Sequence, residues 1–126
     1  GDLIWCTKEE ELDGVTAISG SGPAYVFRFI EALTEAGLRY GFNDVQAKRM
    51  AIATVLGSAE LAKRSGESPS VLREKVTSKG GTTYEALKVM NDRHFMEMMQ
   101  DAMDACKKRA VELGDAFHES VEAAEK

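Results

Sequence analysis

The stretch MAIATVLGSA, residues 50–59, is apolar or small at every position apart from the hydroxyls of Thr54 and Ser58. On a helix, these residues make nearly three turns without a charged face. A helix that is apolar all round must be buried all round. A chain of 126 residues has one modest core, and its other helices can hardly enclose this one. The stretch therefore predicts a surplus of apolar surface, which a second copy of the chain covers through a two-fold interface. The alternative is a central helix in a compact monomer.

Apolar residues at three- and four-residue spacing predict helices on both sides of this stretch, and an all-α fold. The expected helices cover residues 23–40, 44–64, a short segment after 69, 82–91, and 94 to at least 113. Pro23 stands in the opening turn of the first helix, where its missing N–H costs least. We expect the tail after Gly114 to fray because it contains few apolar residues.

The charge and cysteine content exclude several classes of protein. The net charge is −5, from 21 acidic and 16 basic residues, so a nucleic-acid partner is not expected. The basic residues are scattered, and the sequence therefore predicts no membrane-binding patch. Cys6 and Cys106 are the two cysteines, and we interpret them as free thiols in a reducing compartment. With no signal peptide in the opening residues, we expect a cytoplasmic protein.

Residues 3–6, LIWC, are a short apolar run followed by acidic residues. They would suit one strand, but we find no partner strand for it. Because a lone strand leaves its backbone unpaired, this segment suggests the edge of something larger.

The stretch VTAISGSGPAY, residues 15–25, superficially matches a dinucleotide-binding turn. However, the third glycine of that motif would fall at Tyr25, and Pro23 removes a donor from the helix start. No βαβ unit with a ribose-binding acid follows either. We therefore expect a tight turn whose glycines allow close backbone approach. A weaker functional alternative is a contact with a ligand that is bound mainly elsewhere.

The stretch TSKGGTT, residues 77–83, is a better candidate for a binding site. A helix start offers unpaired N–H groups and a partial positive charge. Gly80 and Gly81 would let those amides approach a small carboxylate. Further hydroxyl groups come from Ser78, Thr82 and Thr83. The alternative is ordinary capping, with a glycine ending one helix and a threonine at the N-cap of the next.

Metal and acid–base sites have little support. His94 and His118 lack ligand spacing with either cysteine, so we expect no metal. The acidic residues of 97–104 precede two lysines on one helix, as is typical of solvated helix charge.

Taken together, two stretches resemble the C-terminal domain of the pyrroline-5-carboxylate reductase family. The first is SGSGPAYVF with the following FIEAL, and the second is ESP..LRE.VTSKGGTTYEAL at residues 67–87. The resemblance spans about residues 13–113. The opening LIWC....E..LDGVTA is similar to the end of that family's cofactor domain and its connector.

The resemblance implies a helical bundle that forms an intertwined dimer, as in 6-phosphogluconate dehydrogenase-like reductases. It implies a division into residues 1–13, the end of the cofactor domain and connector, and residues 14–126, the dimerisation and substrate domain. The family reduces pyrroline-5-carboxylate to L-proline with NADPH or NADH, which an N-terminal Rossmann domain binds. That domain is not among these 126 residues, so we expect a C-terminal fragment that is inactive alone. Its dimers would suit a larger assembly.

The resemblance also implies roles for individual residues. Thr83 would be catalytic, through a hydrogen bond to the ring nitrogen of the substrate. The substrate-binding residues would be Val76, Ser78, Gly80, Gly81, Thr82 and Thr83. The nicotinamide cofactor would touch Ser21, Gly22 and Pro23.

One position departs from the family pattern, because Lys79 stands where proline is usual. Lysine leaves the loop less rigid but adds a positive charge beside the expected carboxylate site. Two other functions stay open: a non-catalytic helical dimerisation module, and a small-carboxylate-binding module that uses the same glycines.

Overall fold

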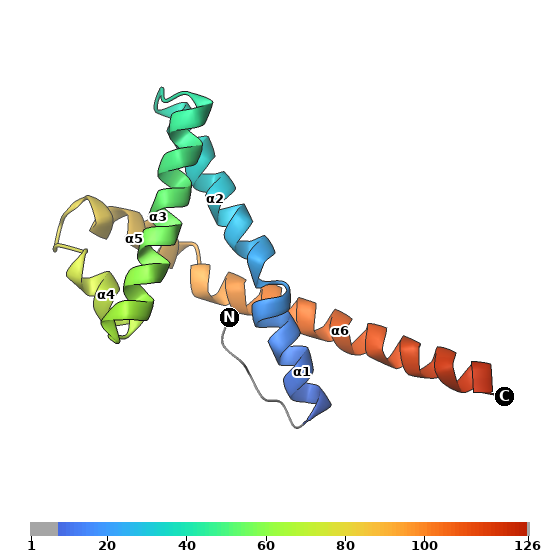
Figure 1. Ribbon diagram of the computed structural model, residues 1–126. Helices are drawn as coiled ribbons and strands as arrows, with labels where there is room; N and C mark the ends of the chain where they lie inside the picture. Colours follow the sequence, from blue (N-terminus) through green and yellow to red (C-terminus); the bar gives the residue numbers. More distant parts are fainter. Residues whose placement is uncertain (1–7, 126) are drawn as a thin grey trace. The chain divides into compact units, whose positions relative to one another are not determined.

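The computed structural model describes residues 8–125, and within them the regular structure is entirely helical. The all-α prediction is therefore confirmed for this part of the chain (Figure 1). The elements are α1 Glu9–Val15, the π-helix η1 Thr16–Gly20, α2 Gly22–Arg39, α3 Asp44–Ser65, α4 Pro69–Lys75, α5 Thr82–Asp92 and α6 Phe95–Glu125. The strand expected at residues 3–6 lies outside the described residues.

The chain divides into two compact units. One joins the residues up to Tyr25 with those from Met96 onward, and the other is Val26–Phe95. The first contains α1, η1 and most of α6, and the second contains most of α2 together with α3, α4 and α5. The candidate residues near Ser21 thus belong to one unit, and those of the glycine loop, residues 77–83, belong to the other.

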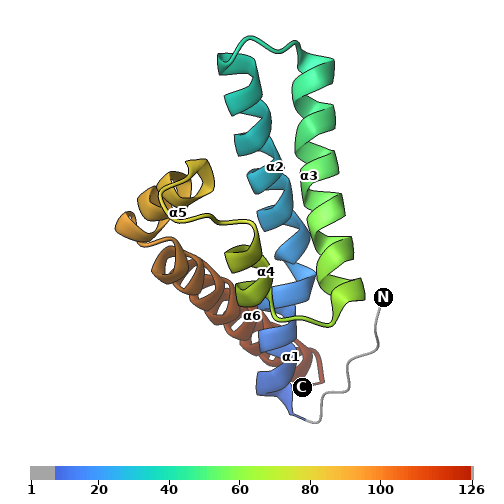
Figure 2. The ribbon, with the colours of Figure 1, turned by 90° about the vertical axis from the view of Figure 1, so that its left-hand side faces the viewer.

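In the second unit, α2 and α3 lie side by side (Figures 1 and 2). Gly37 allows their close approach, because a methyl group there would lie 2.8 Å from the Cβ of Ala47. Gly41, with a φ of 96°, ends α2 in a Schellman motif. Phe42 N donates to Gly37 O at 3.1 Å, and Gly41 N donates to Leu38 O at 3.1 Å. The chain therefore breaks between the two helices expected over residues 23–40 and 44–64, as predicted.

The ends of α3 are also the ones that its sequence predicts. Asn43 and Gln46 form a capping box, in which each side chain accepts from the other residue's backbone N–H. At the other end, Gly66 takes the left-handed conformation with a φ of 70°. Single residues therefore fix both bounds of this helix.

In the first unit, the structure corrects the expected tight turn. Residues 15–20 are helical, and η1 Thr16–Gly20 continues α1 directly. Ser21 N donates to Thr16 O at 2.8 Å, five residues back, as in a π-helix. The Lys107 ammonium lies 3.6 Å from the Glu10 carboxylate, which links α6 to α1. The start of α2 thus extends a helical segment and does not follow a loop.

The last helix, α6, continues to Glu125, although we expected the tail after Gly114 to fray. Half of the twelve residues after Gly114 are alanine or glutamate. Both are strong helix formers, so backbone propensity maintains a helix that has few apolar contacts.

Few side chains are fully withdrawn from water. Among the described residues, the buried apolar ones are Ala17, Ala47 and Ala51. On α3, Val45 and Leu56 are each 65% exposed and Ile52 is 41% exposed. These three side chains line one shallow groove along α3, which we call the α3 groove. The apolar surplus predicted from residues 50–59 is therefore present on the surface of the single chain. No helix among the described residues is long and apolar enough to cross a membrane.

Candidate functional site

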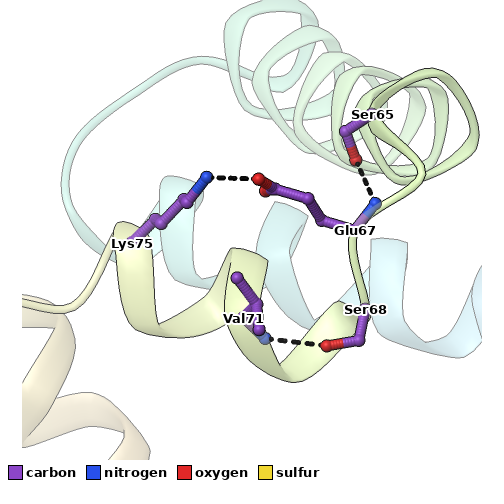
Figure 3. A network of polar contacts seen from close by, with 5 residues as sticks. All are labelled: Ser65, Glu67, Ser68, Val71 and Lys75. Atoms are coloured by element: carbon purple, nitrogen blue, oxygen red, sulfur yellow. Dashed lines mark hydrogen bonds and ion pairs between the residues drawn. The ribbon is translucent and has the colours of Figure 1, made fainter.

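The short helix α4 leads into the glycine loop, and side chains hold both of its ends (Figure 3). Ser68 caps the N-terminus by accepting from Val71 N at 3.3 Å. The Glu67 carboxylate accepts from the Lys75 ammonium at 2.5 Å, so one ion pair spans the whole helix. Glu67 N also donates to the Ser65 hydroxyl at 3.2 Å, which ties the connection to the end of α3. A seven-residue helix is marginal without such contacts.

After α4, the chain makes a turn that we call the glycine turn, residues 78–81. Gly81 N donates to Ser78 O at 3.0 Å, which closes it. Gly80 has a φ of 74°, a left-handed conformation that favours glycine. A methyl group at Gly81 would lie 2.4 Å from Ser78 Oγ and 3.2 Å from Ser78 O. Gly80 is therefore required by its backbone conformation, and a side chain at Gly81 would displace the Ser78 side chain and shift the Ser78 backbone oxygen by a few tenths of an ångström.

The structure also shows how α5 begins. Gly81 is the N-cap residue, and no side chain accepts a hydrogen bond there. The first intrahelical bond is the one that Glu85 N donates to Gly81 O at 3.2 Å. The amides of Thr82, Thr83 and Tyr84, which precede it, have no carbonyl within the helix to bond. They form a row of donors at the positive end of a helix.

This arrangement contradicts the ordinary capping alternative. The C-cap of α4 is Val76, not a glycine, and the N-cap of α5 is Gly81, not a threonine. A side-chain cap would occupy the amides that Gly81 leaves open. A carboxylate fits these donors in charge and size, although Glu85 in the first turn contributes a negative charge nearby.

The expected substrate residues are local to this turn. Ser78, Gly80 and Gly81 belong to the turn itself, and Thr82 and Thr83 begin α5. Val76 lies just before the turn and is 67% exposed.

The expected cofactor residues, Ser21, Gly22 and Pro23, stand where η1 ends and α2 begins. Ser21 is half-buried and Pro23 is exposed. A methyl group at Gly22 would meet nothing within 4 Å. A flat group can therefore approach the backbone here, which fits a contact with a cofactor that is bound mainly by other residues.

Two further residues next to Ser21 were not predicted from the sequence. The Cys106 thiol donates to the Ser21 hydroxyl at 3.2 Å, across 85 positions of the chain. The Tyr25 hydroxyl donates to Ala17 O at 2.8 Å. A hydrogen bond with Cys106 raises the pKa of the Tyr25 phenol above its ordinary value of 10.0, and loss of water contact adds to this. No local pattern indicates this cluster, because it depends on the contact of α6 with the end of η1, 85 positions away in the chain.

Metal chemistry has no candidate site in the described part of the chain. Within residues 8–125, no group of three or more histidine, cysteine, aspartate or glutamate side chains could hold an ion. The donors near the glycine turn are amides and hydroxyls, which suit an anion.

Comparison with known proteins identifies the family. Residues 9–113 match the family model described as pyrroline-5-carboxylate reductase dimerisation. The chain belongs to this pyrroline-5-carboxylate reductase family. The pyrroline-5-carboxylate reductase of Pseudomonas aeruginosa is 39% identical over 115 residues, which are 91% of this chain and 42% of that protein. The pyrroline-5-carboxylate reductase of Synechocystis is 43% identical over 106 residues, 84% of this chain and 40% of that protein.

Solved structures of the family agree with the helical fold. A pyrroline-5-carboxylate reductase from Coxiella burnetii matches with a TM-score of 0.86 at 41% identity, over 90% of this chain and 42% of that one. A Plasmodium falciparum pyrroline carboxylate reductase, solved with NADP bound, matches with a TM-score of 0.79 at 34% identity. That match covers 85% of this chain and 43% of the solved one. The chain therefore spans about two fifths of the length of its relatives.

Proposed function

We propose that this chain supplies the substrate turn and the dimer interface of an NAD(P)H-dependent pyrroline-5-carboxylate reductase, which reduces pyrroline-5-carboxylate to L-proline. The observation that carries the proposal is the family match over residues 9–113. The uncapped start of α5 at Gly81 supports it, because those amides suit the substrate carboxylate.

In this proposal, the glycine turn holds the substrate by its carboxylate. The amides around Gly80, Gly81, Thr82 and Thr83 donate hydrogen bonds to its carboxylate, with Ser78 on the rim and Val76 near the ring. The cofactor supplies a hydride when it is bound. Ser21, Gly22 and Pro23 would hold it from the helical side. Keeping the reactants in line would contribute on the order of 7–11 kcal/mol in a favourable case.

The proposed partner is a second copy of the chain, in a homodimer. The α3 groove and the exposed apolar residues of α2 support it, because a second copy would remove them from water. We also propose that residues 1–13 end a cofactor domain and that residues 14–126 form the dimerisation domain. The proposal also includes a higher oligomer of dimers, NADPH or NADH as the cofactor, and a cytoplasmic location.

The experiment is a chimera with the Pseudomonas aeruginosa relative. The matched segment of that enzyme is replaced by residues 9–126 of this chain, and oxidation of NADPH by pyrroline-5-carboxylate is followed. We expect turnover that depends on the presence of both NADPH and pyrroline-5-carboxylate. A folded, dimeric chimera without turnover would contradict the proposal. If such a chimera still bound L-proline, the carboxylate-binding module would be the better account, and without binding the dimerisation module would be.

Thr83 is the proposed catalytic residue, and its variants test the chemistry of the site. A threonine hydroxyl is a weak acid, so we expect it to relay a proton to the ring nitrogen and to orient the ring. In the active chimera, Thr83→Val, which keeps the shape but removes the hydroxyl, should lower kcat by about tenfold or more. Thr83→Ser should keep most of the activity. Equal kcat for the valine variant and the parent would remove Thr83 from the mechanism.

A further inference from the structure

Three side chains gather where the proposed cofactor contact is made: Ser21 at the end of η1, Tyr25 on α2 and Cys106 on α6. The Cys106 thiol donates to Ser21 Oγ at 3.2 Å, and both groups are part-buried. All three residues belong to the same compact unit of the chain. Of these three residues, only Ser21 has a role in the cofactor contact expected from the sequence, and Tyr25 and Cys106 have none.

The backbone of Ser21 is held on both sides. Its N–H donates to Thr16 O at 2.8 Å, and its carbonyl accepts from Ala24 N at 3.0 Å. These two bonds fix the main chain but leave the hydroxyl able to change rotamer. The thiol of Cys106 is thus the contact that selects one position for the Ser21 oxygen.

Tyr25 holds the other side of the cluster. Its hydroxyl donates to Ala17 O at 2.8 Å, and Ala17 is one of the buried residues, 4% exposed. The bond ties the first turn of α2 to η1. Hydrogen bonding with Cys106 raises the pKa of the Tyr25 phenol, while a hydrogen bond with Ser21 acts in the opposite direction. The Tyr25 phenol thus responds to both Cys106 and Ser21, while its own proton goes to Ala17 O.

A serine hydroxyl can donate once and accept twice. Because the Cys106 thiol donates to it, the Ser21 hydroxyl keeps its own proton and one lone pair for further hydrogen bonds. We propose that Cys106 is a positioning residue, which holds the Ser21 hydroxyl so that this remaining capacity meets the carboxamide of the nicotinamide cofactor. This inference rests on the proposed function, because it needs a cofactor contact at Ser21.

The test uses the active chimera and separates the two Michaelis constants. Cys106→Ala removes the donor, so KM for NADPH should rise by roughly two- to tenfold, the range of one net hydrogen bond. We expect KM for pyrroline-5-carboxylate and kcat to change by less than the cofactor KM. Cys106→Ser keeps a donor and should restore the cofactor KM. Met103→Ala, which shortens another half-buried side chain of α6, is the matched control and should leave it unchanged.

A double-mutant comparison tests whether the effect passes through Ser21. Ser21→Ala should raise the cofactor KM, and adding Cys106→Ala should raise it no further. An unchanged cofactor KM in Cys106→Ala, a failure of Cys106→Ser to restore it, or an equal rise in both Michaelis constants would overturn the inference while leaving the proposed function standing. A chimera without any turnover would overturn both.

The cluster itself has a readout that does not need activity. In the chain of 126 residues, an NMR titration of labelled tyrosine rings, assigned with Tyr25→Phe, reports the Tyr25 phenol. Because the Cys106 contact raises its pKa, Cys106→Ala should lower that pKa toward 10. An unchanged pKa would mean that Cys106 does not lie beside Tyr25 and Ser21 as it does in the structure, and the inference would fail.

Discussion

At the scale of single residues, Gly81 has two roles that no other residue could combine. Its lack of a side chain leaves the first amides of α5 uncapped, and it allows the glycine turn to close against Ser78. A methyl group at this position would lie 3.2 Å from the Ser78 carbonyl oxygen. The serine side chain can rotate away from such a group, but the backbone oxygen must move by a few tenths of an ångström, which loosens the turn.

Gly81→Ala therefore tests the proposed carboxylate site. Opening the turn would redirect the amides of Thr82 and Thr83, so KM for pyrroline-5-carboxylate in the chimera should rise by about tenfold, the effect of losing roughly one charge-assisted hydrogen bond. Steady-state kinetics at varied substrate concentration measure this. Gly14→Ala is the matched control, because a methyl group there meets nothing within 4 Å. A substrate KM that is the same in the Gly81 variant and the parent would place the carboxylate elsewhere.

At the scale of elements, the bounds of the helices could be predicted wherever one residue determines a cap. Gly41, Asn43, Gly66 and Pro69 mark the ends of α2, α3 and α4 in the sequence, and the structure confirms them. These signals are local, since each depends on the conformation or hydrogen bonds of one residue.

Other elements could not be predicted from local signals. The helix α1 and the π-helix η1 carry β-branched residues and two glycines, which have low helix propensity. In the folded unit, α1 is also in contact with α6 through the ion pair between Lys107 and Glu10. The glycine loop was recognised as a candidate site, but its two interpretations were separated only by the observed caps at Val76 and Gly81.

The helix α4 provides a test at this scale. Its end leads directly into Val76 and the glycine turn, so the Glu67–Lys75 ion pair should help to position the turn. Reversing one charge, as in Lys75→Glu, should raise the substrate KM of the chimera by up to about fivefold, since exposed pairs contribute about 0.2–1 kcal/mol. The effect should shrink in high salt.

The double variant Glu67→Lys with Lys75→Glu restores opposite charges and should recover most of the loss. On α6, Glu112 pairs with Arg109 at 3.0 Å, so Glu112→Lys breaks a comparable ion pair away from the glycine turn. It should not change the substrate KM. If Lys75→Glu behaved like this control, the ion pair would have no part in positioning the turn.

At the scale of the whole molecule, the exposed apolar residues of α3 predict the oligomeric state. Light scattering or sedimentation at micromolar concentration should give a dimer for the parent chain. Ile52→Glu would place a charge in the α3 groove, where Ile52 is 41% exposed in the single chain. Burying a charge in an interface is costly, and Lys48 and Arg49 of the same groove offset only part of that cost, so it should weaken the dimer by about tenfold or more.

Lys88→Glu, at an exposed position of α5, introduces the same side chain elsewhere and should leave the dimer intact. A monomeric parent chain would remove the main support for the proposed interface. A dimeric Ile52→Glu variant would show instead that the interface lies away from the α3 groove.

The three buried alanines have a consequence for how such a chain matures. Alanine side chains contribute little transfer free energy, so a newly synthesised copy gains little by folding before it finds another. Until that encounter, its apolar helices stay open to chaperones and to aggregation. Production of the protein at low concentration would then slow its maturation, and recovery after denaturation should follow second-order kinetics.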